Sequence, residues 1–236
     1  LSMGGRRDWL WAAGLCALAL STIADALLSG GAIVPSGPRH DLPAQFLAWR
    51  EFGFSELAKG NLALWNPHLF SGIPFFAGFE SALLYPPNWA HLGLSPVAGV
   101  NFVIALHLCL AGALMFGWAR WRGVSTQGAF VAGAAYMLSG PFFLRLYAGH
   151  LPPLCVMALA PALFCCVEAW IATGAARWWL AGSFTGALML LAGNPQFAYF
   201  AALGAAALAA PRLRFGERPL RRGLGLLGMA SGAAAM

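Results

Sequence analysis

The stretch PVAGVNFVIALHLCLAGALMFGWA, residues 96–119, contains no charged residue and decides the class of fold. About 20 consecutive apolar residues suffice for a helix to cross the hydrocarbon core of a bilayer. The rest of the chain follows the same composition, because 60% of the 236 residues are hydrophobic and only 9% are charged. Soluble domains carry about 25% charged residues. The sequence therefore predicts a protein embedded in lipid.

The apolar runs are continuous rather than alternating, which indicates helices and not the strands of a membrane barrel. We expect an all-α polytopic membrane protein with about six complete transmembrane helices in one domain, residues 1–236. A seventh apolar run starts near Gly223 and is too short to cross, which predicts an N-terminal portion of a longer protein. The expected spans are Trp9–Leu28, Pro96–Ala119, Gln127–Phe143, Pro153–Ala172, Trp178–Ala192 and Phe197–Ala210.

The distribution of basic residues predicts a cytoplasmic N-terminus by the positive-inside rule. Arg6 and Arg7 before an apolar core leave open a cleaved signal peptide, and either interpretation places the next segment outside. Because the arginines are scattered at helix ends, nucleic acid is not an expected partner. The cytoplasmic side would hold Arg6, Arg7, Arg120, Arg122, Arg177, Arg212, Arg214, Arg218, Arg221 and Arg222, and the outer side Arg39, Arg50, Lys59 and Arg145.

Residues 29–95 form the one long polar segment and are predicted to be the first extracytoplasmic loop. The loop holds half of the acidic residues: Asp41, Glu51, Glu56 and Glu80. Within it, Ala44–Lys59 is predicted to be an amphipathic helix in the membrane interface, with Arg50 on its polar side. Residues 61–88 are rich in proline, glycine and aromatic residues, which predicts an irregular ordered loop at headgroup level.

Several polar residues at this outer face could carry chemistry. Asp41 could deprotonate a hydroxyl acceptor as a general base, or it could cap the helix that Pro43 begins. Arg145 could bind a lipid phosphate through its guanidinium or anchor the chain in the interface. Glu80 could be a second acid, a ligand of a divalent cation, or a solvated loop residue. His150 could orient a substrate or cap a helix end.

Motifs for other chemistries are missing from the sequence. It has no phosphate-binding glycine loop ending in Gly-Lys, no His-Glu-x-x-His, no Cys-x-x-Cys pair and no Gly-x-Ser-x-Gly, so nucleotide and zinc chemistry are disfavoured. No metal site is predicted. All five cysteines lie within apolar runs, which indicates buried thiols rather than a disulfide framework.

A series of outer-loop motifs resembles the N-terminal part of the bacterial YfhO-like membrane proteins, within the wider group of GT-C glycosyltransferases. The series begins with His40-Asp41-x-x-x-Gln45 and continues with LWNPHLFSGIP (64–74) and SALLYPPN (81–88). Gly149-His150 and GNPQ (193–196) also resemble short motifs of that family. The resemblance covers residues 25–210 approximately.

The resemblance implies a GT-C-like fold in the bacterial inner membrane and an inverting transferase. Such an enzyme moves a sugar from a polyprenyl-phosphate carrier to an extracytoplasmic glycan or polymer acceptor. Asp41 matches the acid of the family's first outer loop and is therefore the expected general base. No cofactor is implied, although a divalent cation is compatible with the site. The expected substrate-binding residues are Arg39, His40, Gln45, Asn66, His68, Glu80, Tyr85, Arg145, His150 and Gln196.

Two other functions remain open on the sequence. A transporter or flippase would place polar groups near the middle of the membrane on broken helices, and Asn101 and His107 are the polar residues in that position. A non-catalytic membrane assembly protein would tolerate replacement of the polar outer residues but not loss of the spans.

Overall fold

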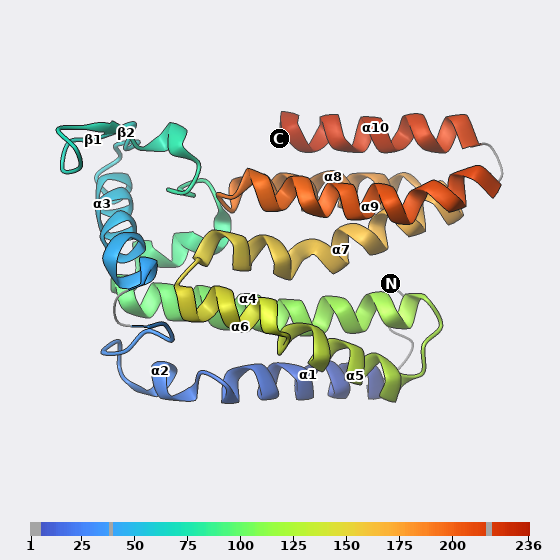
Figure 1. Ribbon diagram of the computed structural model, residues 1–236, viewed down its shortest axis with the longest axis horizontal. Coiled ribbons are helices and arrows are strands. Elements are labelled where there is room, and N and C mark those ends of the chain that lie inside the picture. The colour runs from blue at the N-terminus through green and yellow to red at the C-terminus, as the bar shows by residue number, and fades with distance from the viewer. Residues whose placement is uncertain (1–5, 38–39, 216–218) are drawn as a thin grey trace.

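A computed structural model describes residues 6–37, 40–215 and 219–236, and most of them form helices with their axes along one common direction (Figure 1). Three helical segments are long and apolar enough to cross a membrane, at residues 96–121, 126–148 and 151–173. The all-α prediction is confirmed. The long helices are α1 (Arg6–Ser21), α4 (Pro96–Trp121), α5 (Thr126–Met137), α6 (Gly140–Ala148), α7 (Leu151–Thr173), α8 (Ala176–Leu191), α9 (Pro195–Phe215) and α10 (Pro219–Ala235).

Helices α4 and α7 form the centre of the bundle. Helix α4 packs against α1, α5 and α7, and α7 packs in turn against α8 and α9. Val103, Phe116 and Ala158 are fully buried where these helices meet. Burial of apolar side chains between the helices accounts for the order of the layers that Figure 1 shows, from α1 and α5 at one edge to α10 at the other.

Local sequence signals set the helix ends. The Ser95 hydroxyl accepts a hydrogen bond from the Ala98 N–H at 3.3 Å, and Pro96 follows it at the first helical position of α4, where proline needs no hydrogen-bond partner. Helix α7 ends at Gly174, which has a left-handed φ of 66°. Glycine adopts that conformation without strain.

The span predicted at residues 127–143 lies within the segment 126–148, which is long and apolar enough to cross a membrane, and this segment consists of two helices, α5 and α6. Helix α5 ends at Met137 and α6 begins at Gly140, with Pro141 in its first turn. Proline has no N–H to continue the preceding helix and disfavours helical backbone in the residue before it. The break lets α6 run on to Ala148 in a direction of its own.

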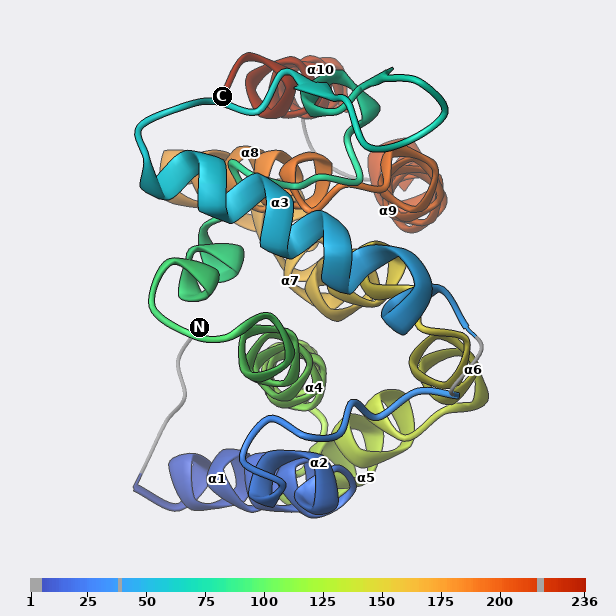
Figure 2. The same ribbon diagram turned by 90° about the vertical axis from the view of Figure 1, so that its left-hand side faces the viewer.

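The first long loop lies across one end of the bundle. Figure 2 looks onto that end and shows α3 crossing in front of the helix ends. The predicted helix at residues 44–59 is present, but its first turn is a π-helix. Helix α2 (Ala24–Leu28) precedes this loop, and the elements of the loop are η1 (Leu42–Phe46, the π-helix), α3 (Leu47–Ala58), β1 (Trp65–Asn66), β2 (Ile73–Pro74), η2 (Phe76–Gly78) and η3 (Pro86–Leu92). Strands β1 and β2 pair antiparallel.

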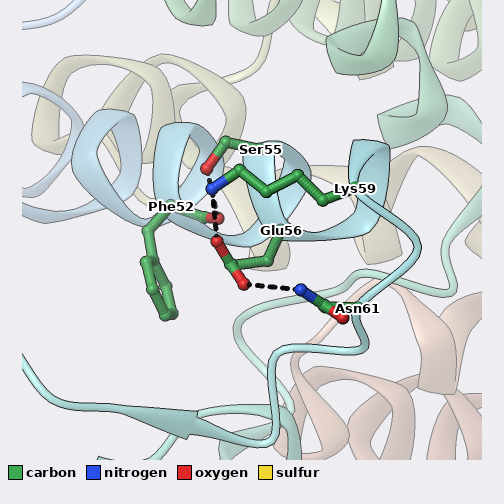
Figure 3. Close-up of polar contacts among 5 residues, drawn as sticks. All are labelled: Phe52, Ser55, Glu56, Lys59 and Asn61. Carbon is green, nitrogen blue, oxygen red and sulfur yellow. Dashed lines mark hydrogen bonds and ion pairs between the residues drawn. The ribbon is translucent and has the colours of Figure 1, made fainter.

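The exposed end of α3 is closed by a small polar network (Figure 3). Lys59 Nζ lies 2.7 Å from Glu56 Oε1, and Asn61 Nδ2 donates to the other Glu56 oxygen at 3.3 Å. The Ser55 hydroxyl donates to the Phe52 carbonyl at 2.9 Å. These contacts hold the chain where it leaves the helix and turns toward the β1–β2 hairpin.

Arg50 is not on an exposed polar face, which corrects a second expectation. Its side chain is 1% exposed, and its guanidinium donates to the backbone carbonyls of Glu80 and Ser81. Burial lowers the pKa of Arg50 to about 10. The residue therefore fastens α3 to the segment that carries Glu80.

Tyr85 fastens the other end of the loop to the bundle. Its hydroxyl lies 2.6 Å from Nε2 of His107 on α4, and both side chains are buried. Nδ1 of His107 lies 2.6 Å from the Val103 carbonyl, which can only accept, so Nδ1 carries the proton and Nε2 accepts from Tyr85.

Replacing Tyr85 with phenylalanine is expected to lower the free energy of unfolding by about 1–3 kcal/mol, because it leaves a buried imidazole nitrogen without a donor. Thermal unfolding of the purified protein in detergent measures the change. Tyr199→Phe is the matched control, because Tyr199 is 60% exposed. Equal melting temperatures for Tyr85→Phe and the wild type would contradict this assignment.

Candidate functional site

Three side chains from distant parts of the sequence form a continuous polar chain at the loop end of the bundle. Nε2 of His150 lies 3.0 Å from Oδ2 of Asp41, and Nη1 of Arg145 lies 2.8 Å from Nδ1 of the same imidazole. Asp41 precedes η1, Arg145 is on α6, and His150 is the residue before α7. The structure therefore joins three residues that the sequence analysis selected separately.

The protons in this chain follow from the donors. A guanidinium can only donate, so Nδ1 of His150 accepts from Arg145 and the ring proton lies on Nε2. Nε2–H then donates to the Asp41 carboxylate. Neither Asp41 nor His150 makes a side-chain hydrogen bond that caps a helix. A neutral imidazole thus links a positive and a negative charge.

Backbone geometry brings Asp41 to His150. Gly149 has a left-handed φ of 76°, and a Cβ at this position would overlap the backbone nitrogen of Leu42. The α6–α7 turn can therefore approach η1 closely only with glycine there. In η1 the Leu47 N–H bonds back to the Leu42 carbonyl, and such π-turns are frequent at functional sites.

Glu80 and Gln45 lie beside this chain. Gln45 Nε2 is 3.5 Å from Glu80 Oε2. Burial raises the pKa of Glu80, and the nearby charge of Asp41 raises it further, while the positive charge of Arg50 acts in the opposite direction. The second acid is therefore half-buried and electrostatically coupled to Asp41, rather than solvated.

Arg145 also contacts the start of α9. Its guanidinium carbon lies 5.0 Å from the centre of the Phe197 ring, within the range of a cation–π interaction. Asn194 Oδ1 accepts from the Phe197 N–H at 2.9 Å, which holds the first turn of α9. Gln196, an expected substrate ligand, is exposed in the same turn.

The other expected ligands lie elsewhere. Asn66 is buried in β1 and accepts from the His68 N–H at 2.9 Å, and His68 is exposed with its ring edge-on to Phe52. Tyr85 is 1% exposed and bound to His107, so its hydroxyl does not reach the surface. His40 packs against Tyr147 with ring centres 4.9 Å apart. Arg39 lies outside the described residues.

Sequence reasoning gave no role to the buried side chains of Asp8, Arg50 and Glu168. Arg50 supports the segment of Glu80, as described above, and nothing local distinguished it from an exposed helix residue. Glu168 on α7 is 5% exposed and pairs with Arg212 at 2.7 Å. An acid inside an otherwise apolar span was the available signal for it. Among the described residues no group of three or more His, Cys, Asp or Glu is arranged to hold a metal ion.

An apolar cavity of about 470 Å³ lies among α7, α8, α9 and α10. Leu190 and Pro195 line the cavity where α8 and α9 are joined. Pro195 is two positions before Phe197 in the sequence. Small residues such as Gly182, Gly186 and Ala202 form much of the wall. A hydrocarbon chain is the kind of ligand that suits this lining.

Gly149→Ala is expected to lower the free energy of unfolding by about 2 kcal/mol, because alanine is strained at a left-handed φ and its methyl group would displace η1. The melting temperature in detergent measures the loss. Gly140→Ala is the control, since a Cβ at Gly140 meets nothing within 4 Å. The same melting temperature in both variants would refute the close approach of the two turns.

The pH dependence of stability tests the environment of Glu80. Because its pKa is higher in the fold than its ordinary value of 4.5, the native state binds more protons in that window, and stability falls as the pH rises from about 4.5. Glu80→Gln should remove this component of a melting curve recorded against pH. A hydrogen bond from Lys59 lowers the pKa of Glu56, so ionisation of Glu56 makes stability rise with pH. Glu56→Gln should therefore remove a rise of stability with pH, where Glu80→Gln removes a fall.

The chain was compared with protein families, curated proteins and solved structures. No protein-family profile, curated protein or solved structure matches the chain. The function has to be inferred from the Asp41–His150–Arg145 chain and from the apolar helices that carry it.

Proposed function

We propose that this protein is a membrane glycosyltransferase of the GT-C type, as the resemblance to YfhO-like proteins suggests. It would transfer a sugar from a polyprenyl-phosphate donor to a hydroxyl of an extracytoplasmic glycan or polymer. The observation that carries the proposal is the chain of Asp41, His150 and Arg145 at one end of a bundle of apolar helices. It supplies a base and a cation side by side.

Asp41 has the geometry of a general base. One oxygen accepts from His150, and among the described residues the other has no partner while the side chain is 55% exposed. In the proposed reaction this oxygen takes the proton of the acceptor hydroxyl as the hydroxyl oxygen bonds to the sugar C1. The C1–oxygen bond to the phosphate breaks on the opposite face, which inverts the sugar carbon.

Arg145 is the group to stabilise the departing phosphate. One N–H of its guanidinium donates to His150, and the remaining donors can bind phosphate oxygens as charge builds up on them. His150 is hydrogen-bonded to both Asp41 and Arg145, so it fixes their relative position without adding a charge of its own. The three side chains thus divide the work between proton removal, orientation and charge stabilisation.

A lipid-linked donor accords with the rest of the fold. The apolar cavity that ends near Phe197 could take part of the polyprenyl chain while the phosphate reaches Arg145. We further propose that α1, α8 and α9 complete a bundle of six spans, with the start of α10 as a seventh. The arginine-rich end would then face the cytoplasm and the candidate site the outer side of the bacterial inner membrane.

One observation favours a transporter as the second candidate, namely the break between α5 and α6, because discontinuous helices are common in transporters. The polar side chains within the bundle are bonded to other protein groups, which disfavours a water-filled path along them. Asn101 donates to the carbonyls of Ala26 and Ile33, and His107 is bonded to Tyr85. Cysteine accessibility labelling that found water along α5 and α6 would favour transport.

Asp41→Asn tests the proposed chemistry in full-length protein supplied with a labelled polyprenyl-phosphate sugar and a glycan acceptor. The amide cannot accept the proton, so the transfer rate should fall by about 10²–10⁴-fold. Arg145→Gln should lower the rate as well, through loss of charge at the phosphate.

Glu51→Gln is the matched control, because Glu51 is an exposed acid on the neighbouring helix α3, and its rate should equal that of the wild type. Unchanged transfer by Asp41→Asn would remove Asp41 as the base. A wild-type protein that transfers no sugar from any polyprenyl-phosphate donor would refute the enzyme as a whole.

A further inference from the structure

The end of the bundle opposite the candidate site concentrates positive charge. Helix α1 begins there, α4 and α9 end there, and α8 and α10 begin there (Figure 1). By sequence, the segments that reach this end contain ten arginines and three acids. The arginines are Arg6, Arg7, Arg120, Arg122, Arg177, Arg212, Arg214, Arg218, Arg221 and Arg222, and the acids are Asp8, Glu168 and Glu217.

Two of these acids are already neutralised inside the bundle. Glu168 binds Arg212 at 2.7 Å, lies 3.9 Å from Arg122 and accepts from the Trp118 indole at 2.9 Å. Asp8 is likewise 5% exposed and lies 3.5 Å from Arg120. These pairs tie the helices together, and among the described residues no ion pair joins Arg177 or Arg221 to a carboxylate.

Arg177 and Arg221 are two cations of this end whose charge is not paired with an acid among the residues that the structure describes. Both side chains are exposed. The guanidinium of Arg222 is held in place, because it stacks over Trp170 with its carbon 5.5 Å from the ring centre and donates to the Trp170 carbonyl at 3.0 Å. It lies against Gly174, where a Cβ would displace it.

Tryptophan marks the depth of this end in the membrane independently of charge. The rings of Trp118, Trp170 and Trp178 each lie under an arginine, at 5.5–5.7 Å from the guanidinium carbon. Trp121 packs on Trp178 with ring centres 5.3 Å apart. Tryptophan concentrates at the headgroup layer of membranes, which favours a position of these stacked arginines near the level of lipid phosphates.

We propose that this end is a binding surface for anionic phospholipid headgroups, with Arg177 and Arg221 as ligands of the phosphate. A guanidinium offers a planar fork of donors that matches phosphate oxygens. Arginines beside the membrane attract anionic lipids, while the fixed Arg222 holds the α7–α8 turn against the start of α10. The surface is separate from the candidate site and does not depend on the reaction proposed there.

Native mass spectrometry of the full chain in detergent tests the proposal by titration with phosphatidylglycerol and, separately, with phosphatidylcholine. Phosphatidylglycerol should bind more tightly. The double variant Arg177→Gln/Arg221→Gln should bind it about thirtyfold more weakly, from the loss of two phosphate contacts. The double variant Arg177→Lys/Arg221→Lys should keep most of the preference, because it keeps the charge.

Lys59→Gln is the matched control, since Lys59 is an exposed basic residue at the other end of the molecule, and it should bind both lipids as the wild type does. Equal binding of the two lipids by the wild type would overturn the proposal. So would an unchanged preference for phosphatidylglycerol in Arg177→Gln/Arg221→Gln.

Discussion

The need to satisfy hydrogen bonds within an apolar chain governs the arrangement of this protein. Backbone N–H and carbonyl groups that face lipid must pair within their own segment, so the apolar stretches form helices. Polar side chains that enter the bundle need partners of their own, and Asn101 and His107 have them in Ala26, Ile33 and Tyr85. Most of the charged side chains lie toward the two ends of the bundle.

The positions of the helices could be predicted because apolar length is a local property of the sequence. The predicted span 96–119 differs from α4 by two residues at one end, and the predicted span 153–172 is extended to 151–173. The predicted span 127–143 lies within the candidate span 126–148, but counting apolar residues did not reveal that this segment is divided into two helices. Gly140 and Pro141 carried the signal for a break, but their effect depends on backbone hydrogen bonds and not on hydropathy.

The candidate site was predictable only as a set of polar turns on one face. Asp41, Arg145 and His150 were each selected locally, but their contact depends on how the first loop returns to the α6–α7 turn. The burial of Arg50 depends on carbonyls about thirty residues away. Long-range contacts of this kind have no local periodicity to reveal them, so the role of Arg50 follows from the structure alone.

The protonation state of Glu80 sets the net charge of the charged side chains around the candidate site. The cluster holds two arginines, Arg50 and Arg145, against two carboxylates, Asp41 and Glu80, joined by a neutral imidazole. With both acids ionised the cluster is electrically balanced, and with Glu80 protonated it becomes cationic by one charge. Protonation of Glu80 therefore strengthens the attraction of this cluster for an anion. The half-burial of Glu80 raises its pKa, so this change occurs at a higher pH than it would for an exposed glutamate.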